Sequence, residues 1–262
     1  FMITFGLASV PTGKTLDDTL KILKTYAKQA KEYGCTALCF PECFLTGYVP
    51  KEADSLAISR NSLVFQEICA LSKSLQMDLL VGFMERNKEY FFITNGIFLA
   101  DGSVSYYQKT HLGEREKLVF TPGNSLDIFT LSCGVKFGMQ ICVETHYNDI
   151  TQSLSLRGAR LIFAPHAVPR VAGNRKKIWN KYIPTRSYDN QVYFACCNQW
   201  DEERFGGGIL VTNAKGDTLT SIYEEKPVVH TFSVEETEIL PLDQNTKRKH
   251  YFPANRRPEL YQ

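Results

Sequence analysis

The chain has 262 residues, of which 44% are hydrophobic and 22% are charged, and its net charge at pH 7 is +2. This composition is typical of a globular protein with a large core. The near-neutral charge disfavours a nucleic-acid or membrane-surface binder, because such proteins need a concentrated basic face. The basic clusters 175–177 and 247–249 are short and are explained as solvated surface. No apolar run approaches the roughly 20 residues that span a bilayer.

Eight cysteines are spread along the chain. Disulfide scaffolds are typical of small secreted proteins, and the first residues lack the basic segment and cleavage site of a signal peptide. Several cysteines lie in apolar runs such as "YFACCN", as reduced, buried cysteines do. Zinc binding by Cys35, Cys39 and Cys43 would need a closed set of four ligands, and Pro41 prevents these residues from sharing a helix face. The sequence therefore predicts reduced cysteines, a cytoplasmic location and no metal site.

Strand and helix patterns alternate in the first half of the chain. Residues 15–34 show apolar residues at helical spacing, with Gly34 as the end of the helix. Residues 61–76 repeat this spacing, and Leu63 is expected to face inward. The expected strands are 2–10, 36–40, 78–86, 90–100 and 104–109, with a hairpin turn at 101–103.

The second half begins with a polar stretch, 110–124, and then returns to alternation. Helices are expected at 148–158 and 174–190, and Pro184 is placed to kink the second. The expected strands are 126–131, 135–142, 159–166, 192–199, 207–213, 218–225 and 226–234. The tail 246–262 has no periodicity and is expected to pack as an extended segment or to belong to an interface. No linker or repeat divides the chain, so we expect one α/β domain over 1–262, with mixed sheets covered by helices.

Several common catalytic and nucleotide-binding motifs are absent from the sequence. It contains no G-x-S-x-G elbow, no H-E-x-x-H and no P-loop. The glycine-rich "FGGGIL", 205–210, begins a strand instead of a helix and lacks the spacing of a dinucleotide site. It indicates close backbone packing or a loop that borders a site.

Three reactive or charged residues stand at the ends of expected buried strands. Glu42 lies among apolar residues, and burial raises the pKa of a carboxylate, which suits it to act as a general base. The alternative is a structural glutamate that caps a turn at Pro41. Lys109 ends a strand and is either an edge-strand lysine or a buried cation that needs an anionic partner. Cys142 stands between a strand and a helix, where backbone N–H groups can activate a thiol as a nucleophile. The alternative is that it is a buried structural cysteine like several of the other seven. Glu116 is a weaker candidate in a charged segment.

Three segments in this order resemble the nitrilase, or carbon–nitrogen hydrolase, family: "FPECFLTGY", "YQKTHL…EKLVFTPGN" and "GVKFGMQICVETHYNDI". The resemblance continues through "GARLIFAPH", "IPTRSYDNQVYFACCN" and "GGGILVTNAKGD" and so covers essentially the whole chain. It implies a four-layer α-β-β-α sandwich that forms a homodimer or a larger homo-oligomer. By motif it makes Glu42 the base, Lys109 the cation, Cys142 the nucleophile and Glu116 a glutamate that positions the substrate and the lysine.

These residues account for amide hydrolysis without a metal or an organic cofactor. Glu42 takes the thiol proton as Cys142 attacks the amide carbon. Lys109 and the backbone N–H of Val143 hold the oxyanion, and Glu42 returns the proton to the leaving amine. Water activated by Glu42 then hydrolyses the thioester on Cys142.

The residues that follow the cysteine depart from the patterns of known family branches. Members that act on carbamoylated or keto acids often place an arginine there, to pair with the substrate carboxylate. Here Thr145 and His146 occupy that region, so the local sequence does not support an acid-recognising pocket. Arg170 or Arg175 could supply a cation instead.

Tyr48, His146 and His166 are expected to border the pocket, although a structural role explains each histidine equally well. A papain-like pair of Cys142 and His146 is disfavoured, because residues four apart at a strand-to-helix turn diverge. A non-enzymatic binding module is disfavoured by the joint presence of the glutamate, lysine and cysteine. We therefore expect an amidase acting on a small carboxamide, with an N-carbamoyl amidohydrolase or a nitrile hydrolase as the alternative.

Overall fold

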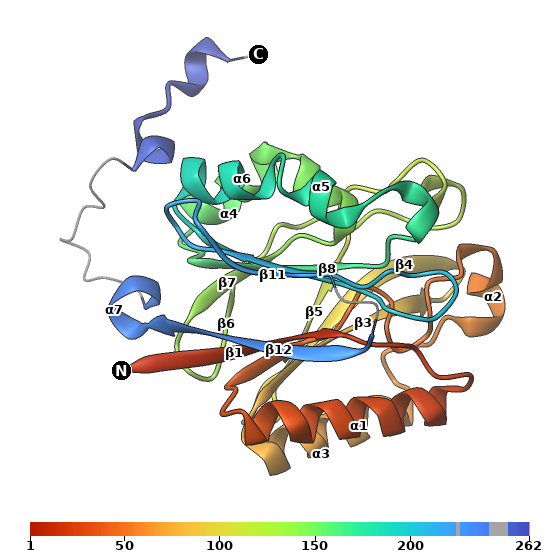
Figure 1. The fold of residues 1–262 in the computed structure, drawn as a ribbon. Coiled ribbons are helices and arrows are strands. Elements are labelled where there is room, and N and C mark those ends of the chain that lie inside the picture. The colour runs from red at the N-terminus through yellow and green to blue at the C-terminus, as the bar shows by residue number, and fades with distance from the viewer. Residues whose placement is uncertain (224–225, 241–250, 262) are drawn as a thin grey trace.

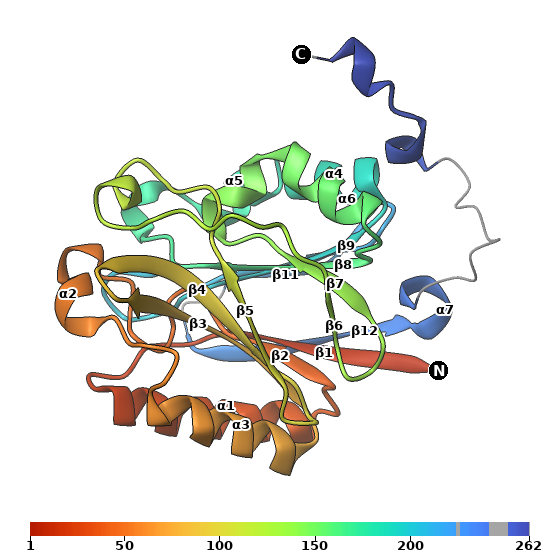
Figure 2. The same cartoon turned by 180° about the vertical axis from the view of Figure 1, so that it is seen from behind.

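The computed structural model describes residues 1–223, 226–240 and 251–261. Within these residues, twelve strands form two six-stranded sheets that pack face to face, and helices cover both outer faces (Figures 1 and 2). The predicted four-layer α-β-β-α sandwich is therefore confirmed. Parts of the expected strand 218–225 and of the tail 246–262 fall on 224–225, 246–250 and 262, outside the described residues.

Each observed strand overlaps an expected one, whereas the short helices Ala53–Leu56 and Glu236–Ile239 were not expected. The strands are β1 (Met2–Ser9), β2 (Ala37–Cys39), β3 (Asp78–Asn87), β4 (Tyr90–Phe98), β5 (Val104–Gln108), β6 (Phe129–Thr130), β7 (Lys136–Met139), β8 (Leu161–His166), β9 (Tyr193–Asn198), β10 (Ile209–Thr212), β11 (Thr218–Ile222) and β12 (Val228–Glu235). The helices are α1 (Leu16–Glu32), α2 (Ala53–Leu56), α3 (Leu63–Leu75), α4 (Asn148–Leu156), α5 (Arg175–Trp179), α6 (Ile183–Asn190) and α7 (Glu236–Ile239).

The first sheet has the order β12-β1-β2-β3-β4-β5, with β1, β2 and β3 parallel. Helices α1 and α3 cover its outer face (Figure 1). Thr15 precedes helix α1, and its side chain accepts a hydrogen bond from the Asp18 N–H and so caps the helix. The expectation that Leu63 faces inward was wrong: it is the first residue of α3 and its side chain is 71% exposed.

The second sheet has the order β11-β10-β9-β8-β7-β6, with β7, β8 and β9 parallel. Helices α4, α5 and α6 lie over its outer face (Figure 2). The single helix expected over 174–190 is two helices, α5 and α6. Pro184 lies in the first turn of α6, where its missing N–H costs no intrahelical bond, so it starts a helix instead of kinking one.

The tail contacts the helices over the second sheet. The Tyr251 and Ser155 hydroxyls lie 2.6 Å apart, and the rings of Phe252 and Tyr188 lie 6.3 Å apart. Two 3-10 turns, η5 (Phe252–Asn255) and η6 (Pro258–Leu260), replace the extended conformation expected for this part of the tail.

Apolar side chains of both inner faces form the core between the sheets. Side chains that follow parallel strands in one sheet meet at one edge of that sheet. This rule brings the residues after β7, β8 and β9 together, and the sandwich places them against the residues after β2 and β5. In the described part of the chain, no helix is both long and apolar enough to cross a membrane.

Candidate active site

Lys109 is held between two carboxylates in the interior. Its side chain is 1% exposed, and its Nζ donates to Glu42 Oε1 at 2.7 Å and to Glu116 Oε1 at 2.8 Å. Burial alone would lower the pKa of this ammonium, but Glu42, Cys142 and Glu116 outweigh that effect and raise its pKa well above the ordinary value. Lys109 is therefore a buried, permanently charged cation and not an edge-strand lysine.

Glu116 is fixed by three donors. In addition to Lys109, the Tyr48 hydroxyl donates to its Oε1 at 2.7 Å and the Gly113 N–H donates to its Oε2 at 2.7 Å. Tyr48 was expected at the border of the pocket, and the structure places its hydroxyl on Glu116. Both residues therefore orient the lysine through one hydrogen-bonded chain.

Glu42 lies beyond the end of β2, and its two oxygens face different parts of the site. Oε1 accepts from Lys109, and Oε2 accepts from the Ala167 N–H at 2.9 Å, directly after β8. Neither oxygen caps the turn at Pro41, which was the alternative reading of this residue. Burial raises the pKa of Glu42 to about 7, with Lys109 opposing the rise and Glu116 adding to it.

The turn that carries Glu42 fits closely against β3 because of a glycine. A Cβ added at Gly82 would lie 2.6 Å from the Cys43 nitrogen and 2.7 Å from the Pro41 oxygen. The absence of a side chain at Gly82 therefore lets the backbone of the turn approach the strand. Cys43 has a φ of 50°, in the left-handed region, which turns the chain sharply after Glu42.

Cys142 follows β7 and begins the 3-10 helix η3 (Cys142–His146) with a φ of 52°. This conformation is strained for a residue with a side chain and is often found at active sites. Burial raises the pKa of its thiol, Glu42 raises it further, and Lys109 opposes the rise. The thiol is therefore neutral at rest, so attack on a substrate requires a base to remove its proton.

The two candidate histidines occupy different environments. The exposed His146 ring stacks on Tyr182 at 4.4 Å, and no hydrogen bond joins it to Cys142 in the described part of the chain. The papain-like pair lacks the contact that it requires. His166 is 1% exposed and contacts the Ala164 carbonyl through Nδ1 at 2.8 Å. Burial lowers its pKa to about 3, so the ring is neutral.

Glu144 was not among the candidate site residues, yet it connects the segment around Lys109 with the turn that carries Cys142. Its carboxylate is fully buried, and no described cation lies within 4.0 Å of it. Five groups donate hydrogen bonds to it, namely the Tyr107 hydroxyl at 2.9 Å, the Thr110 N–H and hydroxyl at 2.7 Å each, the His111 N–H at 3.3 Å and the Ile141 N–H at 2.7 Å. The carboxylate thus ties the residues around Lys109 to the turn that carries Cys142. The only sequence signal was an acidic residue two positions after the cysteine.

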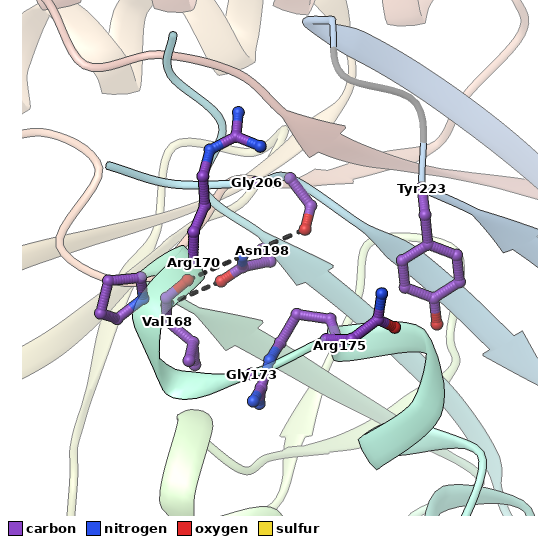
Figure 3. Close-up of a pocket in the computed structure, with 10 residues that line it drawn as sticks. Val168, Arg170, Gly173, Arg175, Asn198, Gly206 and Tyr223 are labelled. Carbon is purple, nitrogen blue, oxygen red and sulfur yellow. Dashed lines mark hydrogen bonds between the residues drawn. The ribbon is translucent and has the colours of Figure 1, made fainter. Parts of the chain in front are cut away.

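A cavity of about 280 Å³ is lined in part by Val168, which directly follows Ala167, the residue whose N–H donates to Glu42 (Figure 3). Its lining includes Val168, Arg170, Arg175, Asn198 and Tyr223. The glycine-rich segment, for which close backbone packing or a loop bordering a site was expected, contributes Gly206 and Gly207 to the lining of this cavity. Among the described residues, no group of three or more His, Cys, Asp or Glu side chains is arranged to hold a metal ion.

Comparisons with known proteins agree with the geometry. Residues 6–232 match the model of the carbon–nitrogen hydrolase family. A nitrilase of Pyrococcus abyssi is 25% identical over 77% of this chain and 78% of its own length, and an omega-amidase of Homo sapiens is 25% identical over 79% of each. A glutamine-dependent NAD(+) synthetase of Thermotoga maritima is 28% identical over 86% of this chain, which spans only 41% of the synthetase.

Solved structures show the same fold. An amidase from Nesterenkonia sp. superposes with a TM-score of 0.84 at 21% identity, covering 99% of this chain and 95% of that one. The match of the family model over nearly the whole chain and this shared sandwich lead to one conclusion: the chain belongs to the carbon–nitrogen hydrolase family and is a hydrolase of non-peptide C–N bonds.

Proposed function

We propose that the chain is an amidase that converts a small carboxamide to a carboxylic acid and ammonia through a thioester on Cys142. The observation that carries the proposal is the buried Lys109 ammonium between Glu42 and Glu116, whose charges all act on the Cys142 thiol. A glutamate-to-glutamine mutant of the Nesterenkonia amidase shows covalent addition of the acetamide moiety of fluoroacetamide at its own active-site cysteine. That observation supports a nucleophilic role for Cys142.

The first half of the proposed reaction forms the thioester. The thiol proton moves from Cys142 to the Glu42 carboxylate while the sulfur–carbon bond forms. Glu42, with a pKa of about 7, is suited to accept that proton and then to give it to the leaving nitrogen as the carbon–nitrogen bond breaks. Ammonia leaves, and the acyl group stays on the sulfur.

The charge that develops on the carbonyl oxygen needs donors that the resting structure has not used. An ammonium has three N–H donors, and Lys109 gives two of them to Glu42 and Glu116, which leaves one for the oxyanion. The Val143 N–H donates to no described group and is the second proposed donor. Water deprotonated by Glu42 then attacks the thioester and restores the free thiol.

The test is ammonia release from a panel of carboxamides, N-carbamoyl compounds and nitriles. Glutamine belongs in the panel because one relative is glutamine-dependent. Cys142→Ala is the blank, and Cys69→Ala, a cysteine on α3, is the matched control. We expect carboxamides to give acid and ammonia only, with an acyl adduct on Cys142 detected by mass spectrometry. Carbon dioxide as a product would show a carbamoyl hydrolase, and hydrolysis restricted to nitriles would show a nitrilase.

Two further expectations remain predictions. The resemblance implies a homodimer or larger homo-oligomer. Size-exclusion chromatography with light scattering measures the molar mass and so tests this expectation. The cytoplasmic location rests on the sequence alone.

A further inference from the structure

The side chain of Asn95 is enclosed in the core and bonds to no described group. Asn95 lies in the middle of β4 and is fully buried, and both its amide nitrogen and its amide oxygen lack a described partner. Another fully buried asparagine, Asn198, bonds through its amide to the backbone of Val168 and Gly207. Buried polar atoms in native structures normally have a partner, so the Asn95 amide indicates a ligand that the chain itself does not supply.

The direction of this amide follows from the register of the strands. Ile93 and Ile97 belong to the core between the sheets, and Asn95 alternates in step with them, so its side chain points to the same inner face. The partner of Asn95 on β3 is Gly82. Directly opposite residues of an antiparallel pair have Cβ positions about 4.5–5.5 Å apart on one face. The amide therefore lies beside Gly82, on the face that the turn carrying Glu42 covers.

That turn has an unused hydrogen-bond donor at the same place. Cys43 is fully buried, and its backbone N–H donates to no described group. A Cβ added at Gly82 would lie 2.6 Å from the Cys43 nitrogen and 2.7 Å from the Pro41 oxygen, so both backbone atoms lie on the side of β3 where Asn95 points. An unpaired N–H of the turn and an unpaired amide of the sheet thus lie near each other in the interior.

These groups together suit a water molecule. A water can accept a hydrogen bond from the Cys43 N–H and donate to the Asn95 amide oxygen and the Pro41 carbonyl, and buried waters make about three such bonds. A metal ion could not bond to the N–H group, and an anion could not bond to the two oxygens. The ligand must both donate and accept, and it must be small enough for a closed interior.

We propose that one enclosed water molecule bridges the Asn95 amide to the backbone of residues 41–43, and that this water holds the turn that carries Glu42. Cys43 has a φ of 50°, so the chain turns sharply directly after Glu42 and its direction there depends on what holds the turn. Both carboxylate oxygens of Glu42 are hydrogen-bonded, and a small movement of the turn would lengthen these bonds. Asn95 is then a positioning residue, a role that rests on the proposed amidase function because it acts through the proposed base.

A crystal structure of the unsubstituted protein, at a resolution that shows ordered waters, tests the water site and needs no substrate. We expect electron density for one water within hydrogen-bonding distance, about 2.7–3.2 Å, of the Asn95 amide and of the Cys43 nitrogen. Absence of such density, or a direct bond between these two groups, would overturn the proposal. This measurement decides the water site even if a variant at Asn95 does not fold.

Asn95→Leu keeps a similar shape and removes the hydrogen-bonding groups. With the best carboxamide of the panel, we expect kcat to fall on the order of tenfold and KM to stay within twofold, because a displaced base slows the chemistry and leaves substrate binding intact. The midpoint of thermal unfolding should fall by roughly 4 °C or more, since the Cys43 N–H loses its acceptor. A higher midpoint with an unchanged kcat would show that the Asn95 amide holds nothing and would overturn the proposal.

Two further variants separate positioning from packing. Asn95→Ser keeps a hydroxyl that can bond the water, so we expect kcat to return to within about threefold of the unsubstituted value. Ile97→Val, on the same face of β4, is the matched control for lost packing: its unfolding midpoint should fall by roughly 2–4 °C and its kcat should stay within twofold. A loss of kcat in Ile97→Val as large as in Asn95→Leu would overturn the positioning role.

The outcomes separate this proposal from the amidase function. Ammonia release with a kcat that Asn95→Leu does not change would overturn the positioning role and leave the amidase standing. No ammonia from any compound of the panel, above the Cys142→Ala blank, would overturn the amidase function and the positioning role with it, while the crystal structure still decides the water site.

Discussion

Replacing Glu144 by glutamine should destabilise the protein substantially, although the two side chains have the same shape. The amide oxygen can take the place of Oε1, where four donors converge, but the amide nitrogen then faces the Ile141 N–H that now donates at 2.7 Å. A buried N–H left without an acceptor costs about 1–3 kcal/mol, and each bond that loses its charge assistance weakens by roughly 0.5 kcal/mol or more. Relief from burying a charge offsets part of this. We expect the free energy of unfolding to fall by about 3 kcal/mol.

Urea denaturation followed by circular dichroism measures this loss. For a chain of this size, about 3 kcal/mol corresponds to a midpoint of thermal unfolding lower by roughly 6–12 °C. Glu203→Gln, at an exposed position, is the control and should change the stability by less than about 0.5 kcal/mol. Below the unfolding range, kcat should still fall roughly tenfold or more, because Glu144 links the residues around Lys109 to the Cys142 turn. A stability loss below about 1 kcal/mol would refute the structural role assigned to Glu144.

Three further predictions concern the proposed catalytic residues and the turn that carries Glu42. Because Glu42 must be ionised to accept the thiol proton and its pKa is about 7, kcat/KM should fall about tenfold per pH unit below pH 7 and level off above it; a midpoint near that of an ordinary glutamate would contradict this assignment. Gly82→Ala should push the turn around Cys43 away from β3 and lower kcat at least tenfold, and an unchanged kcat would show that the turn tolerates the added Cβ. Lys109→Met leaves Glu42 and Glu116 without their cation, so we expect denaturation to show a loss of about 3–5 kcal/mol and ammonia release to disappear; an unchanged unfolding midpoint would argue against the buried ion network.

The sequence predicted the alternation of strands and helices well because the apolar periodicity in α1, α3 and α4 is strong and the buried runs are bounded by turns, whereas the four layers were implied by the family resemblance. The prediction from the sequence was wrong where a single residue decides at which position a helix begins or ends. Pro184 fits a first helical turn as well as a kink, and in the structure α5 ends at Trp179 and α6 begins at Ile183. Leu63 fitted the helical spacing, but its position at the exposed start of α3 depends on where the helix begins.

Candidate residues for the site could be named from the sequence because motif order and residue type identify them. Glu42, Lys109 and Cys142 are far apart in the chain, and their meeting requires three strand ends at one place. Glu144 was not assigned a role, because its surroundings come from other segments: its donors come mainly from the residues around Lys109. Arg175 was named only as an alternative source of a cation, and the cavity beside it is lined in part by β9 and the residues after β11.

His146 and Glu144 show most clearly which properties of the site follow from the sequence and which follow only from the tertiary structure. The sequence by itself determined the family and the alternation of strands and helices, and it named the residue types that the proposed chemistry needs, since these depend on local pattern and motif order. The tertiary structure decided which of the groups beside Cys142 serve the site. His146 was expected at the border of the pocket, but the turn after β7 directs that ring onto Tyr182 and buries Glu144 among five donors. Burial and hydrogen bonding set the pKa and the position of a side chain, and both depend on the packed sandwich and not on the residues adjacent in the sequence.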